Sequence, residues 1–130
     1  MQRFFSKRKE VLFVFWLLVC FVLLHIPAIH QPYHQDEYKW PIIVNPELTP
    51  PGGIPHPPVG EFIYRHAGFL VGYENFRLVP FFFGSLNLLL LYYLLRFAFG
   101  KKTAMWGSAI FAFSFYSLLA SLVVDTDGAI

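Results

Sequence analysis

Three apolar segments, each long enough to cross a bilayer, constrain this chain of 130 residues more than any other feature. They cover residues 11–29, 80–99 and 103–124. A helix of ~20 apolar residues spans roughly 30 Å of hydrocarbon with its backbone hydrogen bonds satisfied internally. Hydrophobic residues make up 56% of the sequence and charged residues only 14%, which is more apolar surface than a soluble domain of this size buries. The sequence therefore predicts an all-α membrane protein with three transmembrane spans.

Basic residues mark one side of the predicted spans. They are Arg3, Lys7, Arg8 and Lys9 before the first span, and Arg96, Lys101 and Lys102 around the turn at 100–102. Because Lys and Arg accumulate in cytoplasmic segments, we expect residues 1–10 and the turn at 100–102 to be cytoplasmic. The net acidic loop 30–79 and the turn at 125–130 are then extracytoplasmic, in a protein of the cell membrane.

The first span also has the basic start and apolar centre of a signal peptide. The residues at its end, LLHIPAIHQP, lack a clear small-residue cleavage pattern, so an uncleaved anchor is favoured. The only cysteine, Cys20, lies inside this span and has no partner in the chain for a disulfide. The short basic clusters do not line one face, and we expect no nucleic-acid partner.

The third span carries small residues at helical spacing. They are Ala104, Ser108 and Ala112, followed by Ser117 and Ser121. Small residues four positions apart let helices approach closely, and the pattern suggests more helix neighbours than two other spans supply. The chain ends on the apolar residues GAI after the third span. We therefore expect the front part of a longer membrane protein, with 125–130 as a truncated outer turn.

The outer loop, residues 30–79, is far longer than the ~15 residues beyond which structureless loops become uncommon. Its many aromatic residues favour a position at the membrane–water interface. Residues 41–58 are rich in proline and exclude a continuous helix. Residues 59–71 predict an amphipathic interfacial helix, which begins after Pro58 and pairs Glu61 with Arg65 four positions later.

The stretch HQDEYKWP places Asp36 and Glu37 side by side just beyond the first span. Such a pair is often just an exposed juxtamembrane turn. A carboxylate at a partly buried interface gains proton affinity, however, and then suits a general base. Adjacent acids on an irregular segment point in different directions, so one can take a proton while the other orients a partner or a cation.

Further candidate residues lie at the same predicted membrane face. His56, before two prolines, forms a rigid turn that holds an imidazole for a phosphate or a metal, although the loop histidines match no closed metal site. Arg77 either snorkels to the interface, binds an anionic headgroup or pairs with an acid of the loop. Asp125 and Asp127 either end the span and cap the next element, or form a second carboxylate group facing the first.

Taken in order, these motifs resemble a known family. They are DE at 36–37, HPP at 56–58, RLVP at 77–80, the turn YYLLRFAFGKKTA and an aspartate after the third span. This order resembles the N-terminal part of the dolichyl-phosphate-mannose–protein mannosyltransferases. It also resembles the wider set of polyprenyl-phosphate-sugar transferases with the GT-C fold, including bacterial aminoarabinose transferases. The resemblance covers nearly the whole chain.

The resemblance implies a transferase that moves a sugar from a polyprenyl-phosphate carrier to an acceptor hydroxyl on a protein, lipid or glycan. Asp36 corresponds to the catalytic base, and Glu37 would bind the acceptor or shape the site. His56 and Asp127, or Asp125 in its place, would border the site. Relatives often carry a basic residue where this chain has His56.

Glycosyl transfer needs a base for the acceptor and a positive group for the departing phosphate. The positive group would be His56, Arg77, a divalent cation held by carboxylates, or a basic residue beyond Ile130. The main alternative is a non-catalytic three-span subunit or assembly factor that uses the small-residue stripe as its interface. A transporter fragment with Asp125 and Asp127 on an ion path is a third reading, although no charge lies deep within a span.

Overall fold

The computed structural model describes residues 2–34, 37–44, 47 and 58–124. Within these ranges the chain is all-α, with six α-helices, one short 3-10 helix and no strand. The helices are α1 (Gln2–Ile29), α2 (Lys39–Val44), α3 (Pro58–Val71), η1 (Tyr73–Asn75), α4 (Leu78–Phe99), α5 (Lys101–Phe113) and α6 (Phe115–Ala120). The all-α expectation is confirmed for the part of the chain that is described.

Two of these helices are long and apolar enough to cross a membrane. They are Lys7–Ile29, which is most of α1, and Leu78–Phe99, which is α4. Most of their surface is exposed, including Trp16 at 60%, Leu94 at 64% and Phe97 at 93%. Exposed apolar surface of this extent is unusual for a soluble monomer and suits a hydrocarbon environment. These helices match the first two predicted spans within two residues at the ends nearest the loop.

The predicted third helix over 103–124 is wrong as a single helix, because the chain breaks at Ser114. Ser114 has an extended backbone (φ −72°, ψ 137°), and its hydroxyl accepts a hydrogen bond from the backbone N–H of Ser117 at 3.2 Å. A serine side chain that caps the following turn offers the backbone an alternative to a continuous helix. Neither α5 nor α6 alone is long enough to cross ~30 Å of hydrocarbon.

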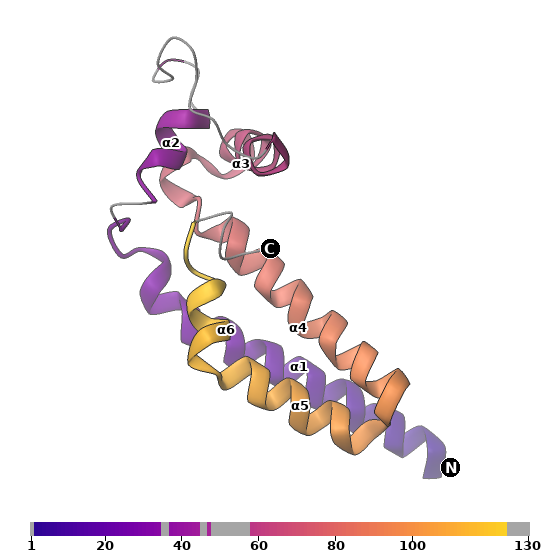
Figure 1. Ribbon diagram of the computed structural model, residues 1–130. Coiled ribbons are helices and arrows are strands. Elements are labelled where there is room, and N and C mark those ends of the chain that lie inside the picture. Colours follow the sequence, from indigo (N-terminus) through magenta and orange to yellow (C-terminus); the bar gives the residue numbers. More distant parts are fainter. Residues whose placement is uncertain (1, 35–36, 45–46, 48–57, 125–130) are drawn as a thin grey trace.

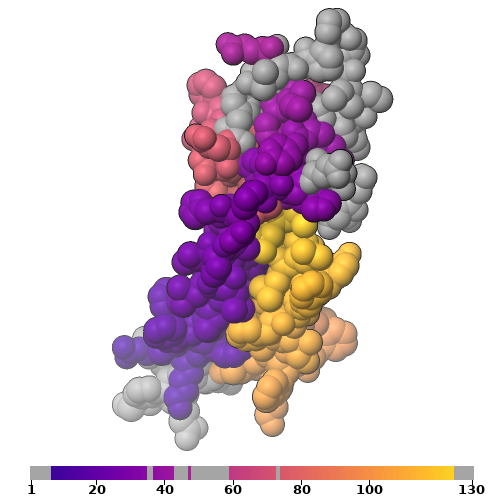
Figure 2. All heavy atoms as spheres, turned by 90° about the vertical axis from the view of Figure 1, so that its left-hand side faces the viewer, coloured from indigo at the N-terminus to yellow at the C-terminus, as the bar shows by residue number. Residues whose placement is uncertain are grey.

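Helices α1, α4 and α5 form an elongated bundle (Figure 1). Helices α4 and α5 are antiparallel and make the most extensive contact, joined by a tight turn at Gly100. Helix α1 packs against both, and Figure 2 shows it beside the α5–α6 segment on one face. The core between these helices contains Leu17, Phe21, Leu88 and Ala112.

The small residues of the predicted third span are buried inside this bundle. Ala104, Ser108 and Ala112 are fully buried, and Ser117 and Ser121 are nearly so. Close helix contact at this stripe is therefore confirmed. The neighbours that contact α5 are α4 and α1 of the same chain, together with α6, so the stripe does not need additional helices to cover it.

Helices α2 and α3 lie at the end of the bundle opposite the N-terminus (Figure 1). Their core contains Trp40, Tyr64, Phe76, Val79 and Val124. Helix α3 begins at Pro58, one residue before the predicted start, and ends at Val71 as predicted. Arg65 Nη2 lies 2.6 Å from Glu61 Oε1, so the expected pair is confirmed. Its outward face carries Phe62, Phe69 and Leu70, the last two at least 80% exposed.

Candidate functional site

Glu37 and Arg77 form a buried ion pair at the α2–α3 end of the bundle. Arg77 Nη2 donates to Glu37 Oε2 at 2.6 Å, and Arg77 Nε donates to Glu37 Oε1 at 3.1 Å. Glu37 is 2% exposed and Arg77 8%. The two-point geometry matches the planar guanidinium to the carboxylate, which is the strongest form of this pair. Of the three roles predicted for Arg77, the structure supports pairing with an acid of the loop.

All five N–H groups of Arg77 are hydrogen-bonded. Besides the two bonds to Glu37, Nη1 donates to the backbone carbonyls of Ala28 at 2.7 Å and Gln31 at 2.9 Å, and Nη2 donates to that of Pro32 at 3.0 Å. The last carbonyls of a helix have no partner within the helix. Arg77 therefore closes the C-terminal end of α1, where a positive charge also suits the helix dipole.

The Glu37 carboxylate binds two further backbone groups. Oε2 accepts from the N–H of His34 at 2.6 Å, and Oε1 accepts from the N–H of Val124 at 3.0 Å. This junction, made of Tyr33, Glu37, Arg77 and Val124, joins three segments: the loop after α1, the start of α4 and the chain after α6. A charged pair in such a place is stable only because its polar atoms are satisfied.

Both partners of the pair are held in their charged forms. Burial by itself raises the pKa of Glu37, but hydrogen bonds from Arg77, Val124 and His34 and the charge of Arg77 outweigh it, so that the pKa is lowered. The hydrogen bond to Glu37 raises the pKa of Arg77. At neutral pH the junction therefore contains one carboxylate and one guanidinium.

Tyr33 is a part of the junction that the sequence did not single out. Its hydroxyl accepts from the backbone N–H of Phe76 at 2.9 Å, and the Arg77 guanidinium carbon lies 5.4 Å from its ring centre. Burial raises the pKa of Tyr33. The only sequence signal was the high aromatic content of the loop, which does not distinguish Tyr33 from its aromatic neighbours.

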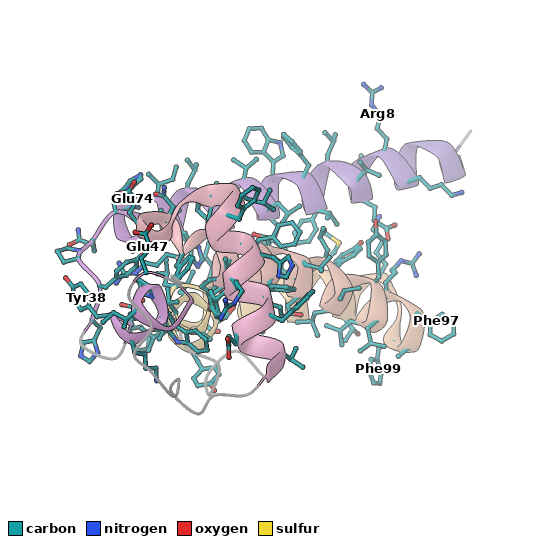
Figure 3. The ribbon with its side chains drawn as sticks, turned by 90° about the horizontal axis from the view of Figure 1, so that it is seen from above. Arg8, Tyr38, Glu47, Glu74, Phe97 and Phe99 are labelled. Atoms are coloured by element: carbon teal, nitrogen blue, oxygen red, sulfur yellow. The ribbon has the colours of Figure 1, made fainter. Side chains whose placement is uncertain are left out.

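A polar hollow of about 470 Å³ opens beside the junction. Its polar and aromatic lining residues are His30, Gln31, Tyr33, Tyr38, Glu74 and Asn75. The Tyr33 and Tyr38 rings meet edge to face with centres 5.9 Å apart, and Figure 3 shows Tyr38 and Glu74 at this end of the molecule. The volume falls in the range of small-molecule sites, and amide, carboxylate and phenol groups suit a ligand rich in hydroxyls.

Four of the predicted site residues, Asp36, His56, Asp125 and Asp127, lie outside the described residues. Glu37 and Val124, which are the sequence neighbours of Asp36 and Asp125, are hydrogen-bonded to each other at 3.0 Å.

Among the residues that the structure describes, no group of three or more His, Cys, Asp or Glu side chains is placed to hold a metal ion. A divalent cation therefore stays a prediction that rests on the sequence.

No protein-family model, no curated protein and no solved structure matches this chain at a significant level.

Proposed function

We propose that the chain is part of a membrane glycosyltransferase of the GT-C type. In this proposal it moves a hexose or pentose from a polyprenyl-phosphate carrier to an acceptor hydroxyl on the extracytoplasmic side. Helices α1 and α4 are the first two spans, α5 and α6 together form a broken third span, and α3 lies in the outer interface. Broken helices are tolerated in membranes where the freed backbone groups are buried or bonded, and the Ser114 hydroxyl bonds the backbone at the break.

The observation that carries the proposal is the junction of Glu37, Arg77 and Val124. It ties Glu37 of the first loop, the start of α4 and the end of the third apolar segment to one end of the bundle. The proposed transferase needs these segments at one outer face of the membrane. The polar hollow beside the junction supports a ligand rich in hydroxyl groups at the same end.

In the proposed reaction the acceptor oxygen attacks the anomeric carbon of the lipid-linked sugar. The bond from that carbon to the carrier phosphate breaks, and the phosphate leaves with the electron pair. Asp36 accepts the proton of the acceptor hydroxyl. Glu37 takes the shaping role, because four hydrogen bonds already occupy its carboxylate and its pKa is lowered, both of which oppose proton uptake.

The test is sugar transfer by the protein reconstituted in vesicles, with polyprenyl-phosphate sugars labelled in the sugar. We expect D36N to abolish transfer while membrane insertion stays normal. The matched control is E47Q, which removes another acid of the same loop and should leave transfer within about two-fold, because few surface changes exceed 0.5 kcal/mol. Transfer by D36N at the wild-type rate would show that Asp36 is not the base.

A non-catalytic membrane subunit is the second candidate. The saturation of Arg77 favours it, since all five of its N–H groups are used inside the protein and none remains for a phosphate. In that case the wild-type protein would transfer no sugar from any carrier tested, and it would co-purify with a partner.

A further inference from the structure

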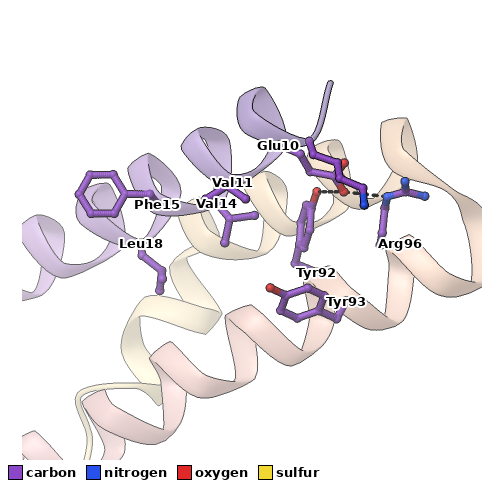
Figure 4. A pocket seen from close by; sticks show the side chains of 9 residues that line it. Glu10, Val11, Val14, Phe15, Leu18, Tyr92, Tyr93 and Arg96 are labelled. Carbon is purple, nitrogen blue, oxygen red and sulfur yellow. Dashed lines mark hydrogen bonds and ion pairs between the residues drawn. The ribbon is translucent and has the colours of Figure 1, made fainter. Parts of the chain in front are cut away.

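A second hollow lies at the other end of the bundle, between the start of α1 and the end of α4 (Figure 4). Its volume is about 470 Å³. The residues that line it are Lys7, Glu10, Val11, Val14, Phe15, Leu18, Tyr92, Tyr93 and Arg96. We propose that this groove binds one anionic phospholipid of the cytoplasmic leaflet, with its phosphate between Lys7 and Arg96 and an acyl chain along α1. The inference rests on the proposed membrane placement and not on sugar transfer.

The charged end of the groove suits a phosphate. Arg96 Nε donates to Glu10 Oε1 at 2.7 Å, and the Tyr92 hydroxyl donates to the same oxygen at 2.8 Å. Lys101 Nζ lies 3.7 Å from Glu10 Oε2. The charge of Glu10 is thus offset within the protein, and Lys7 adds a further positive charge to the lining. The Arg96 side chain stays 44% exposed despite its bond to Glu10, so the guanidinium remains accessible.

The apolar part of the groove suits a lipid chain. Val11, Val14 and Leu18 follow one another along α1, and from Val11 to Leu18 the helix rises by about 10 Å. That length is about two thirds of a hydrocarbon leaflet of ~15 Å. Tyr92 and Tyr93, with ring centres 5.7 Å apart, lie about one helical turn before Arg96 on α4, next to the charged end. Tyrosines favour this headgroup depth.

The order of these groups along the membrane normal decides between possible occupants. Positive charge stands at the helix ends, tyrosines come next and aliphatic side chains lie deeper, which matches the order of phosphate, glycerol and chain in a phospholipid. A second apolar helix would fit the deeper part but would bury the Lys7 ammonium in an apolar contact, which is costly. Basic groups near the cytoplasmic surface attract anionic lipids in particular.

The test is retention of lipid by the whole purified protein, measured by native mass spectrometry in detergent. The probes are phosphatidylglycerol and phosphatidylcholine with identical acyl chains. We expect phosphatidylglycerol to be retained preferentially, and K7Q to weaken its apparent affinity roughly five-fold. The matched control is R8Q, which removes the same charge from the next residue. Figure 3 shows Arg8 pointing away from the body of the molecule, and this variant should bind as the wild type does.

A second variant tests the apolar part. V14W fills the groove and should reduce retention of both lipids, with helical content by circular dichroism as the check on folding.

Equal retention of the two lipids, or equal losses in K7Q and R8Q, would overturn the proposal. Normal retention in V14W would also overturn it, because the lipid would then bind the surface charge and not the groove. D36N should bind lipid normally, so loss of sugar transfer and loss of lipid binding are separate results.

Discussion

At the scale of single residues, Glu37 and Arg77 are the buried charged groups of the junction. Each partner is almost fully removed from solvent, and each has several hydrogen bonds that water would otherwise supply. Removing one partner from such a pair leaves an uncompensated buried charge. Replacing both partners removes the charge altogether.

We predict that R77M lowers the free energy of unfolding by about 3–5 kcal/mol, because it strands the Glu37 carboxylate. The double variant E37M/R77M should lose less than the sum of the two single variants. Denaturant unfolding in detergent, followed by circular dichroism, measures both quantities. Additive losses would mean that the two side chains act independently in the folded protein.

Acid should weaken the same junction. The pKa of Glu37 is lowered in the folded protein, so its stabilising effect is present above its unfolded pKa of about 4.3 and is lost as pH falls through the folded pKa. We predict that the unfolding free energy of the wild type declines below about pH 4.3. E37Q should show a smaller decline in unfolding free energy. If the unfolding free energies of the wild type and E37Q fall in parallel with pH, Glu37 is not the group that causes the acid sensitivity.

At the scale of elements, α4 packs closely at Gly84 against Ser121, the residue that follows α6. A Cβ added at Gly84 would lie 2.6 Å from the Cβ of Ser121 and overlap its hydroxyl. At Gly107 the corresponding atom would meet only the side chain of Leu95, whose Cδ1 is the far end of a flexible group. The two glycines of the bundle therefore differ in what surrounds them.

We predict that G84A destabilises the protein by about 1–3 kcal/mol through overpacking. G107A should cost less, since Leu95 can move aside. G84A/S121G should recover part of the loss, because Ser121 is the side chain in the way. Thermal unfolding of the wild type, G84A, G107A and G84A/S121G measures these stabilities. Equal losses of stability in G84A and G107A would refute the prediction.

The turn between α4 and α5 depends on backbone conformation and not on space. Gly100 has φ 88° and ψ 177°, and no atom lies within 4 Å of an added Cβ. That region of backbone space is open almost only to glycine. G100A should therefore cost about 1–3 kcal/mol, while K102A, at an exposed position in the first turn of α5, should be close to neutral. An unchanged melting temperature in G100A would show that the turn does not need the backbone conformation of Gly100.

At the scale of the whole molecule, the two ends of the bundle carry different groups. The α2–α3 end has the junction and the polar hollow. The opposite end has the basic residues of the groove, of which Figure 4 shows Arg96. The proposed topology places the first end outside and the second inside the cell.

We predict that a cysteine at Glu47 reacts with an impermeant thiol reagent from outside intact cells. A cysteine at Lys102 should react only after the membrane is opened. Both variants are made with C20S, so that each protein has one thiol. Labelling in the reverse order would invert the topology and, with it, the proposed leaflet of the lipid groove.

The positions of α1, α3 and α4 were predictable because they depend on interactions between residues close in the sequence. The apolar lengths of 11–29 and 80–99, the proline at the start of α3 and the Glu61–Arg65 pair all depend on neighbours within one or two turns. The break at Ser114 was missed, because a serine in an apolar run is compatible with a helix and its capping bond to Ser117 forms only when the chain turns there.

By itself, the sequence determined the helical class, the two long apolar helices α1 and α4, and the residues that favour one side of a membrane. Only the tertiary structure decided that Arg77 pairs with Glu37, that Val124 joins them and that the small residues of α5 are covered by this chain's own helices. The physical reason is that helix formation and transfer to an apolar phase act on contiguous residues. A buried charge instead needs partners from several distant segments to replace its lost water.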